Sequence, residues 1–254
     1  MDIKMRAVVT LGAALACGTE AFAERGFTNE FVSGATRPQS IALLPVEASI
    51  TRAQVVETVG LIDESVVFGA QFNTEVAELL TAKGYQVQVV DADRINADRM
   101  LQEYVVDAKR AYDEMIARYR PKKLEQRLYN AGDSARLLAA HLGVDAIAFS
   151  RLSITITPAG KAIVAGLFGG TTSGASSMIG IVDGDTADLE VVQIGVAVVM
   201  PGEKTPDEIS AYVANLAAGS TRRLPGADPS QRPEVEVAES DEAVLDEVES
   251  LIRE

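Results

Sequence analysis

The sequence contains no tryptophan, one histidine and one cysteine, and aromatic residues make up only 5% of its 254 positions. Because Cys17 is alone, neither an internal disulfide nor a thiolate metal cluster can form. A single histidine, His141, excludes metal sites that need two imidazoles, and we expect neither a metal nor another cofactor. The absence of tryptophan argues against a sugar-cleaving enzyme, whose cleft needs aromatic platforms beside its paired carboxylates.

Basic residues are also scarce, since 23 Lys and Arg face 37 Asp and Glu and leave a formal charge of −14. Proteins that bind nucleic acids neutralise phosphates with Lys and Arg, so we expect no nucleic-acid partner. Hydrophobic residues make up 47% of the chain, which is the share found in folded domains. The length is enough for one large domain with a sizeable core.

None of the common catalytic motifs is complete. Gly160 and Lys161 resemble part of a phosphate-binding loop, but Ala162 stands where that loop needs Ser or Thr. Ser173 and Ser176 lack the flanking glycines of a nucleophile elbow. We therefore expect a protein that is not an enzyme.

The amino terminus has the pattern of an export signal. Lys4 and Arg6 precede residues 7–19, which carry no charge. A run of this length is typical of a signal-peptide core and is short for a membrane span. We assign residues 1–23 to a signal peptide and expect export to the periplasm.

Two processing sites compete in this region. Ala21 and Ala23 are the small residues that precede signal-peptide cleavage, which predicts Glu24 as the mature amino terminus. The alternative is lipidation of Cys17. Ala14 stands where the lipoprotein motif prefers leucine, so that motif is degenerate.

Hydrophobic periodicity predicts alternating strands and helices over one domain, residues 40–226. Buried or alternating apolar runs predict strands, and residues with 3.6-residue spacing predict the helices between them. This order predicts an α/β fold, a three-layer sandwich in which helices pack on the faces of a mixed β-sheet. Strands are expected at 41–46, 85–89, 145–157, 178–182 and 189–200, and helices at 72–83, 100–120, 122–129, 133–142 and 206–216. We expect a flexible amino-terminal segment at 24–39 and a loop or frayed helix at 48–60.

Residues 109–127 form a basic stretch within the acidic chain, with seven Lys and Arg against three Asp and Glu. One interpretation is a solvated helix face. The other is a contact for an anionic partner or for the protein's own acidic tail. The candidate contact residues are Lys109, Arg110, Arg118, Arg120, Lys122 and Lys123.

Residues 162–182 carry no charge and are rich in glycine. Because a hairpin needs only a few loop residues, a segment this long predicts a functional insertion that contacts protein or membrane. The alternative is that these residues extend the two flanking strands and pack in the core. The exposed apolar residues at the tip would be Ile163, Val164, Leu167 and Phe168.

The last segment, residues 227–254, holds ten acids and two arginines. Its composition predicts a loosely attached acidic tail. Within it, Asp241 to Arg253 have the spacing of a short amphipathic helix. The apolar stripe of that helix would consist of Val244, Leu245, Val248, Leu251 and Ile252.

Three short motifs resemble those of a bacterial envelope family. Residues 41–46 read IALLPV, residues 142–147 read LGVDAI, and residues 181–186 read IVDGDT. In their order they resemble proteins of the curli-secretion lipoprotein type, the amino-terminal domain of the Tol-Pal propeller protein, and the lipoprotein activators of penicillin-binding proteins. Ala187 stands where the third motif has glycine, and no tryptophan closes the last strand.

This resemblance implies a non-enzymatic accessory, scaffold or assembly factor of the cell envelope. Its partners would be envelope proteins, with homo-oligomer formation and contact with the outer membrane. The alternative is a subunit of an outer-membrane secretion pore, in which residues 162–182 form the membrane hairpin.

Overall fold

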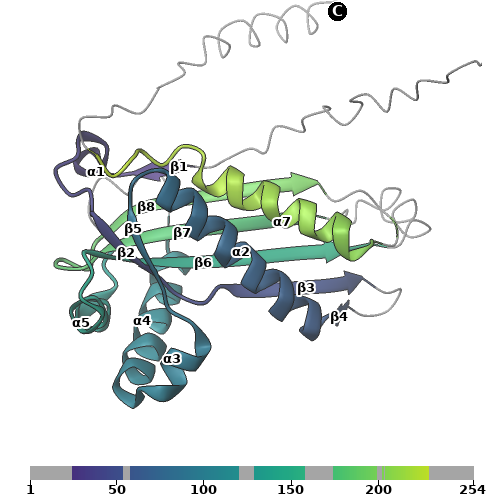
Figure 1. The fold of residues 1–254 in the computed structure, drawn as a ribbon, viewed down its shortest axis with the longest axis horizontal. Helices are drawn as coiled ribbons and strands as arrows, with labels where there is room; N and C mark the ends of the chain where they lie inside the picture. The colour runs from purple at the N-terminus through teal and green to yellow at the C-terminus, as the bar shows by residue number, and fades with distance from the viewer. Residues whose placement is uncertain are drawn as a thin grey trace, which may run out of the picture.

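The computed structural model describes residues 25–53, 58–119, 129–157, 174–198, 202 and 204–228. Over these ranges one mixed sheet of eight strands carries six helices, so the predicted three-layer α/β fold is confirmed (Figure 1). The strands are β1 (Arg25–Phe27), β2 (Ser40–Leu43), β3 (Glu47–Ala53), β4 (Thr58–Gly60), β5 (Gln86–Val89), β6 (Ala146–Ile156), β7 (Gly174–Asp183) and β8 (Leu189–Val198). The helices are α1 (Asn29–Ser33), α2 (Ile62–Ala82), α3 (Ala92–Ala97), α4 (Arg99–Ala117), α5 (Gly132–Leu142) and α7 (Pro206–Thr221).

The long strand β6 organises the sheet. Its neighbours give the order β1-β8-β7-β6-β2-β5, and β3 pairs with β6 while β4 pairs with β3. Strands β2 and β3 lie one after the other along the same edge of β6: Ile41 is opposite Ala146, and Glu47 is opposite Arg151. The expected strand at 41–46 is shorter, because β2 ends at Leu43, and Pro45 lies in the link between the two strands.

Local sequence signals set the helix ends. The Asp98 side chain accepts hydrogen bonds from the backbone N–H groups of Met100 and Leu101 at the start of α4. Thr205 and Glu208 form a capping box at the start of α7. Gly143 ends α5 in the left-handed conformation, with φ 67°, which glycine adopts without strain.

Each face of the sheet has its own apolar core. On one face α2 and α7 bury Phe72, Val76, Val213 and Leu216 against β6 and β7. The second core is formed by α4 and α5 with Ala42, Ile147, Phe149 and Val182, among others. Side chains of successive β6 residues alternate between these cores, as expected for a central strand.

The expected flexible segment at 24–39 is instead structured from Arg25 onward. Strand β1 pairs with β8, and Phe31 of α1 is fully buried. The Arg37 guanidinium is also buried and donates to the backbone carbonyls of Val32 and Gly226, at 2.6 and 3.0 Å. These contacts join the first described residues to the last ones.

Residues 48–60 are not a loop or frayed helix, because β3 and β4 form an antiparallel pair there. Among the described residues of this stretch only Ile50 is buried, so the alternation of the strands is weak in the sequence. The expectation that 162–182 lies outside the core is wrong from Gly174 onward. Strand β7 is central, and Ile179 and Ile181 are fully buried.

Candidate functional site: an open half of the sheet

Helices cover only half of one sheet face. Helices α3, α4 and α5 gather beneath the half that holds the start of β6, and no described helix lies beneath the other half (Figure 1). On this face the α4–α5 core ends at Phe149 on β6, while Met178 of β7 and Ile194 of β8 are partly buried and pack against its edge. We call the rest of this face the open half. Met178 and Ile194 border it at the edge of that core, and the residues beyond them lie under no described helix: Ser49, Thr51, Ser153, Thr155, Ser176 and Val196.

Strand register places the open-half side chains in rows. Ser49 is opposite Ser153, which is opposite Ser176, so three hydroxyls lie side by side across β3, β6 and β7. The hydroxyls of Thr51 and Thr155 form a neighbouring pair, 3.2 Å apart. The floor on this side is therefore uncharged, polar and made of small side chains.

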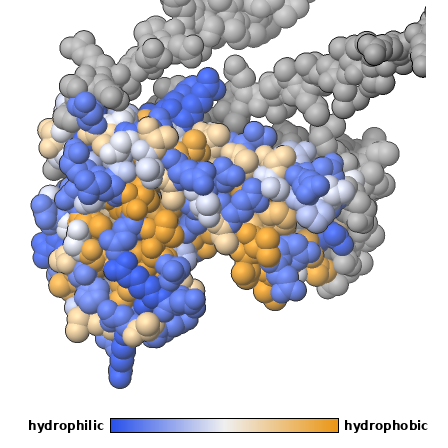
Figure 2. Space-filling view, in the orientation of Figure 1, coloured by the Kyte–Doolittle hydropathy of each residue, from blue (hydrophilic) through white to orange (hydrophobic). Residues whose placement is uncertain are grey.

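Apolar side chains border this floor on β7 and β8. Met178 is opposite Ile194, and Val196 is opposite Ser176 with 41% of its surface exposed. The hollow over this region has a volume of about 440 Å³. Figure 2 shows the outline indented between the lobe of α3–α5 and the corner formed by β4 and the start of α2. The residues that line this hollow are Glu47, Ala48, Ser49, Arg151, Leu152, Ser153, Ser176, Ser177, Met178 and Ile194.

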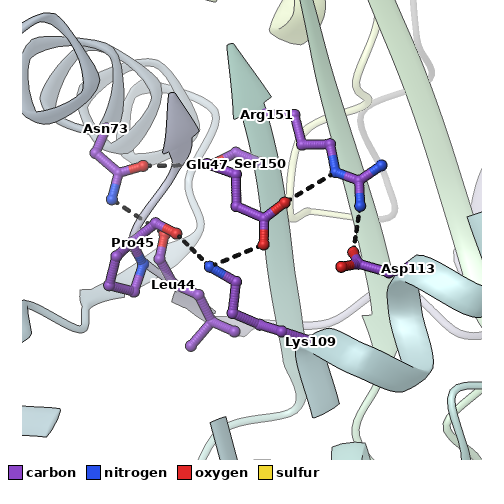
Figure 3. A network of polar contacts seen from close by, with 8 residues as sticks. All are labelled: Leu44, Pro45, Glu47, Asn73, Lys109, Asp113, Ser150 and Arg151. Atoms are coloured by element: carbon purple, nitrogen blue, oxygen red, sulfur yellow. Dashed lines mark hydrogen bonds and ion pairs between the residues drawn. The ribbon is translucent and has the colours of Figure 1, made fainter. Parts of the chain in front are cut away.

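A charged cluster separates the open half from the helix-covered half (Figure 3). Glu47 of β3 pairs with Lys109 Nζ at 3.2 Å and with Arg151 Nε at 3.1 Å. Arg151 also pairs with Asp113. Because Lys109 and Asp113 are four residues apart, they lie on one side of α4. The cluster fixes this side of α4 to β3 and β6, and its two positive and two negative charges cancel.

Aromatic packing lies directly behind this cluster. The Tyr112 and Phe149 rings stack with centroids 4.2 Å apart, and the Arg151 guanidinium lies 5.9 Å from the Tyr112 centroid. The Tyr112 hydroxyl is buried and has no hydrogen-bond partner among the described residues. Burial raises the pKa of Tyr112 far above its ordinary value, so the phenol stays neutral.

A second polar link lies on the opposite face of the sheet, between the strands and α2 (Figure 3). Asn73 Nδ2 donates to the Leu44 carbonyl at 3.1 Å, and Ser150 Oγ donates to Asn73 Oδ1 at 3.3 Å. These bonds satisfy a buried amide and hold the joint between β2 and β3 against α2. The border of the open half is thus fixed from both faces of the sheet.

The basic candidates from the sequence have local partners where they are described. Lys109 belongs to the charged cluster, Arg110 pairs with Asp107 at 3.4 Å, and Arg118 donates to the Glu114 carbonyl at 3.0 Å. The remaining candidates lie outside the described residues: Arg120, Lys122, Lys123, Cys17, Ala21, Ala23, Glu24, Ile163, Val164, Leu167 and Phe168.

His141 joins two helices. Its Nε2 lies 2.8 Å from Asp98 Oδ2, so the end of α5 contacts the residue that caps α4. Hydrogen bonds from the Leu101 backbone and from His141 lower the pKa of Asp98. No group of three or more His, Cys, Asp or Glu residues in the described ranges converges as a metal site would require.

The sequence interpretation missed a second surface, the outer face of α2. Ile62, Val66 and Val67 are 77, 68 and 62% exposed, while Phe68 and Phe72 on the opposite side are buried. The first turns of α2 are thus apolar on both sides. The sequence does contain a signal for this surface, because Ile62, Val66 and Val67 are apolar. They precede the helix that we expected to begin at Phe72.

No family model and no curated protein matches this chain. Among solved structures, it is similar to the PelC dodecamer from Paraburkholderia phytofirmans at 8% identity and a TM-score of 0.37, over 78% of this chain and 95% of that one. It is similar to lipoprotein GNA1162 from Neisseria meningitidis at 17% identity and a TM-score of 0.29, over 72% and 99%. The LpoB C-terminal domain from Salmonella enterica has 12% identity and a TM-score of 0.27, over 68% and 96%.

At these scores the similarities assign no function to the chain. None of the helices in the described ranges combines the length and apolar character that a membrane span requires.

Proposed function

We propose that this chain is a non-enzymatic scaffold or accessory protein of the bacterial envelope, and that it binds another envelope protein with the open half of its sheet. The observation that carries the proposal is a sheet face that no described helix covers, beside a half of the same face that lies under α4 and α5. The floor of the open half is uncharged and its apolar border includes Met178, and the cores of protein contacts are depleted in charged residues and enriched in methionine.

The charged cluster supports a binding role over a catalytic one. Its four groups already neutralise one another through ion pairs, and none of them faces a candidate nucleophile at hydrogen-bonding distance. A general acid or base needs a position beside the reacting group. The cluster instead gives the open half a rigid edge.

The exposed apolar face of α2 supports self-association as a second contact. Ile62 and Val66 are four residues apart and lie on one side of the helix, next to Val67. Contiguous apolar side chains at this exposure mark protein contacts in soluble proteins. We propose that this face joins copies of the chain into a homo-oligomer.

The secretion-pore alternative loses its main support. It requires residues 162–182 as a membrane hairpin, whereas residues 174–182 belong to a central strand with partners on both edges. We therefore retain the scaffold proposal alone. Placement in the periplasm, with contact to the outer membrane, rests on the export signal expected at 1–23 and on the envelope-type motifs.

Site-specific photocrosslinking in cells tests the binding role. A photoreactive residue at position 153 should give a discrete adduct with another polypeptide. The same residue at position 74, exposed on α2, serves as the matched control and should give no such adduct. Equal labelling at both positions, or none at position 153, contradicts the proposal. The intact mass of the envelope form tests the location, with Glu24 as the expected first residue and lipid on Cys17 or an uncut chain as the contrary result.

A further inference from the structure

Among the described residues, no helix covers the open half. Helices α2 and α7 pack on one face of the sheet, and α4 and α5 pack on the helix-covered half of the other. After the last described residue, the sequence contains an amphipathic pattern, Asp241 to Arg253. We propose that this carboxyl-terminal segment covers the open half of the same molecule when no partner is bound.

The dimensions of the two parts agree. The open half spans four strands, β3, β6, β7 and β8, which is about 15 Å from first to last at about 4.8 Å between neighbours. Its length along β6, from Arg151 to Ile156, is about 16 Å. As a helix, the 13 residues of Asp241–Arg253 would be about 20 Å long and about 10 Å wide. One such helix fits this surface.

The chain also has the length to reach. The described domain ends at Asp228, beside the buried Arg37, and Gln39 donates to the Ala227 carbonyl at 3.1 Å. Gln39 precedes β2 at the same end of the sheet as the start of β6. Residues 229–240 then supply 12 residues, with a reach of about 40 Å when extended. The open half begins about 17 Å along β6 from Ala146, so the connection is long enough to pass around the sheet edge.

The side chains of the segment match the surface on which it would lie. Its apolar stripe centres on Val248, and the apolar border of the open half is formed by Met178, Ile194 and Val196. The small hydroxyl side chains of β6 and β7 allow a helix to approach closely. Opposite the stripe, Asp246 and Ser250 would face water, and Glu247 and Glu249 would flank it.

This inference rests on the proposed function, because it gives the binding surface a regulator. A tail that occupies the open half competes with the envelope partner for the same residues. The partner must then displace the tail. The partner's apparent affinity is therefore its intrinsic affinity multiplied by the fraction of molecules whose open half is uncovered.

Disulfide trapping in the full-length chain tests the contact. With Cys17→Ser as background, the pair Ser176→Cys and Val248→Cys should form an intramolecular disulfide in most molecules. Two matched pairs serve as controls: Ser176→Cys with Ser250→Cys, on the other side of the tail helix, and Thr74→Cys with Val248→Cys, on the other side of the sheet. Both should cross-link at least fivefold less.

Three results would overturn the assignment: equal yields for all pairs, no disulfide in any pair, or disulfides only between molecules. A second measurement uses alkylation of Ser176→Cys alone. Adding Val248→Asp and Leu251→Asp should raise its alkylation rate at least fivefold, and an unchanged rate counts against the contact. Photocrosslinking at position 153 in cells reports the partner independently, so the tail assignment can fail while the proposed function stands.

Discussion

The Tyr112 ring of α4 occupies the space that a side chain at position 180 of β7 would fill. A Cβ placed on Gly180 would lie 2.8 Å from both Cε2 and Cζ of that ring, closer than real Cβ contacts allow. The absence of a side chain at Gly180 therefore lets α4 approach the sheet. This approach brings Lys109 and Asp113 to Glu47 and Arg151 at the border of the open half.

Gly180→Ala should destabilise the domain by about 1–3 kcal/mol, because the added methyl group overpacks a rigid aromatic stack. Chemical denaturation measures the change. The matched control is Gly219→Ala in α7, where a Cβ meets nothing within 4 Å and alanine favours the helix. A loss at position 219 as large as at position 180, or no loss at position 180, would contradict the packing account.

Tyr112→Phe should leave stability unchanged or raise it by up to about 1 kcal/mol. The hydroxyl that it removes is buried without a hydrogen-bond partner among the described residues, and such a group costs free energy in the folded state. The ring stack on Phe149 remains. Thermal unfolding of both proteins measures the difference, and a clear loss of stability would show that the hydroxyl has a bonding role.

The sequence was sufficient to predict the layers of this fold but not the open half. Regular periodicity revealed α4 and β6, and Thr205 with Glu208 marked the start of α7. Strand β3 was missed because only Ile50 gives it an apolar face. The row formed by Ser49, Ser153 and Ser176 depends on which residues are opposite one another across three strands. This register becomes apparent only when the strands are paired.

Asp145→Asn should destabilise the domain by about 1 kcal/mol at neutral pH. Burial opposes ionisation of Asp145, but hydrogen bonds from Ser40 (backbone 2.9 Å, hydroxyl 2.9 Å) and from the Gln39 backbone (3.0 Å) outweigh it and lower its pKa. Because the pKa of Asp145 is lower in the folded chain than in the unfolded chain, where it is near 4, its ionised form stabilises the fold at pH values above the unfolded pKa. This stabilisation is lost as the pH falls through the folded pKa.

Denaturation curves from pH 7 down to pH 3 measure this dependence. The gap between the two proteins should be widest near neutrality and should narrow below about pH 4. Asp185→Asn, in the exposed turn after β7, is the control and should show little difference at any pH. A gap that stays constant down to pH 3 would exclude an ionised Asp145 as the cause.

Val66→Asp should shift the full-length chain toward the monomer, because it places a charge in the exposed apolar face of α2. Light scattering with size-exclusion chromatography measures the molar mass over a range of concentrations. Thr74→Asp adds the same charge at another exposed position of the helix and should leave the mass unchanged. A wild-type chain that is already monomeric, or equal effects of both variants, would remove this face as the oligomer contact.

Thiol alkylation in intact cells tests the central claim, that the open half is a protein-binding surface. A single cysteine at position 153, with Cys17→Ser as background and residues 229–254 deleted so that the tail cannot cover it, is compared in cells and in the purified chain. Both apolar cores lie within residues 25–228, so this shorter chain retains them. We predict at least tenfold slower alkylation in cells at position 153, and equal rates in both settings for a cysteine at position 74. Equal rates at position 153 would show that the open half faces solvent in the cell and would contradict the account.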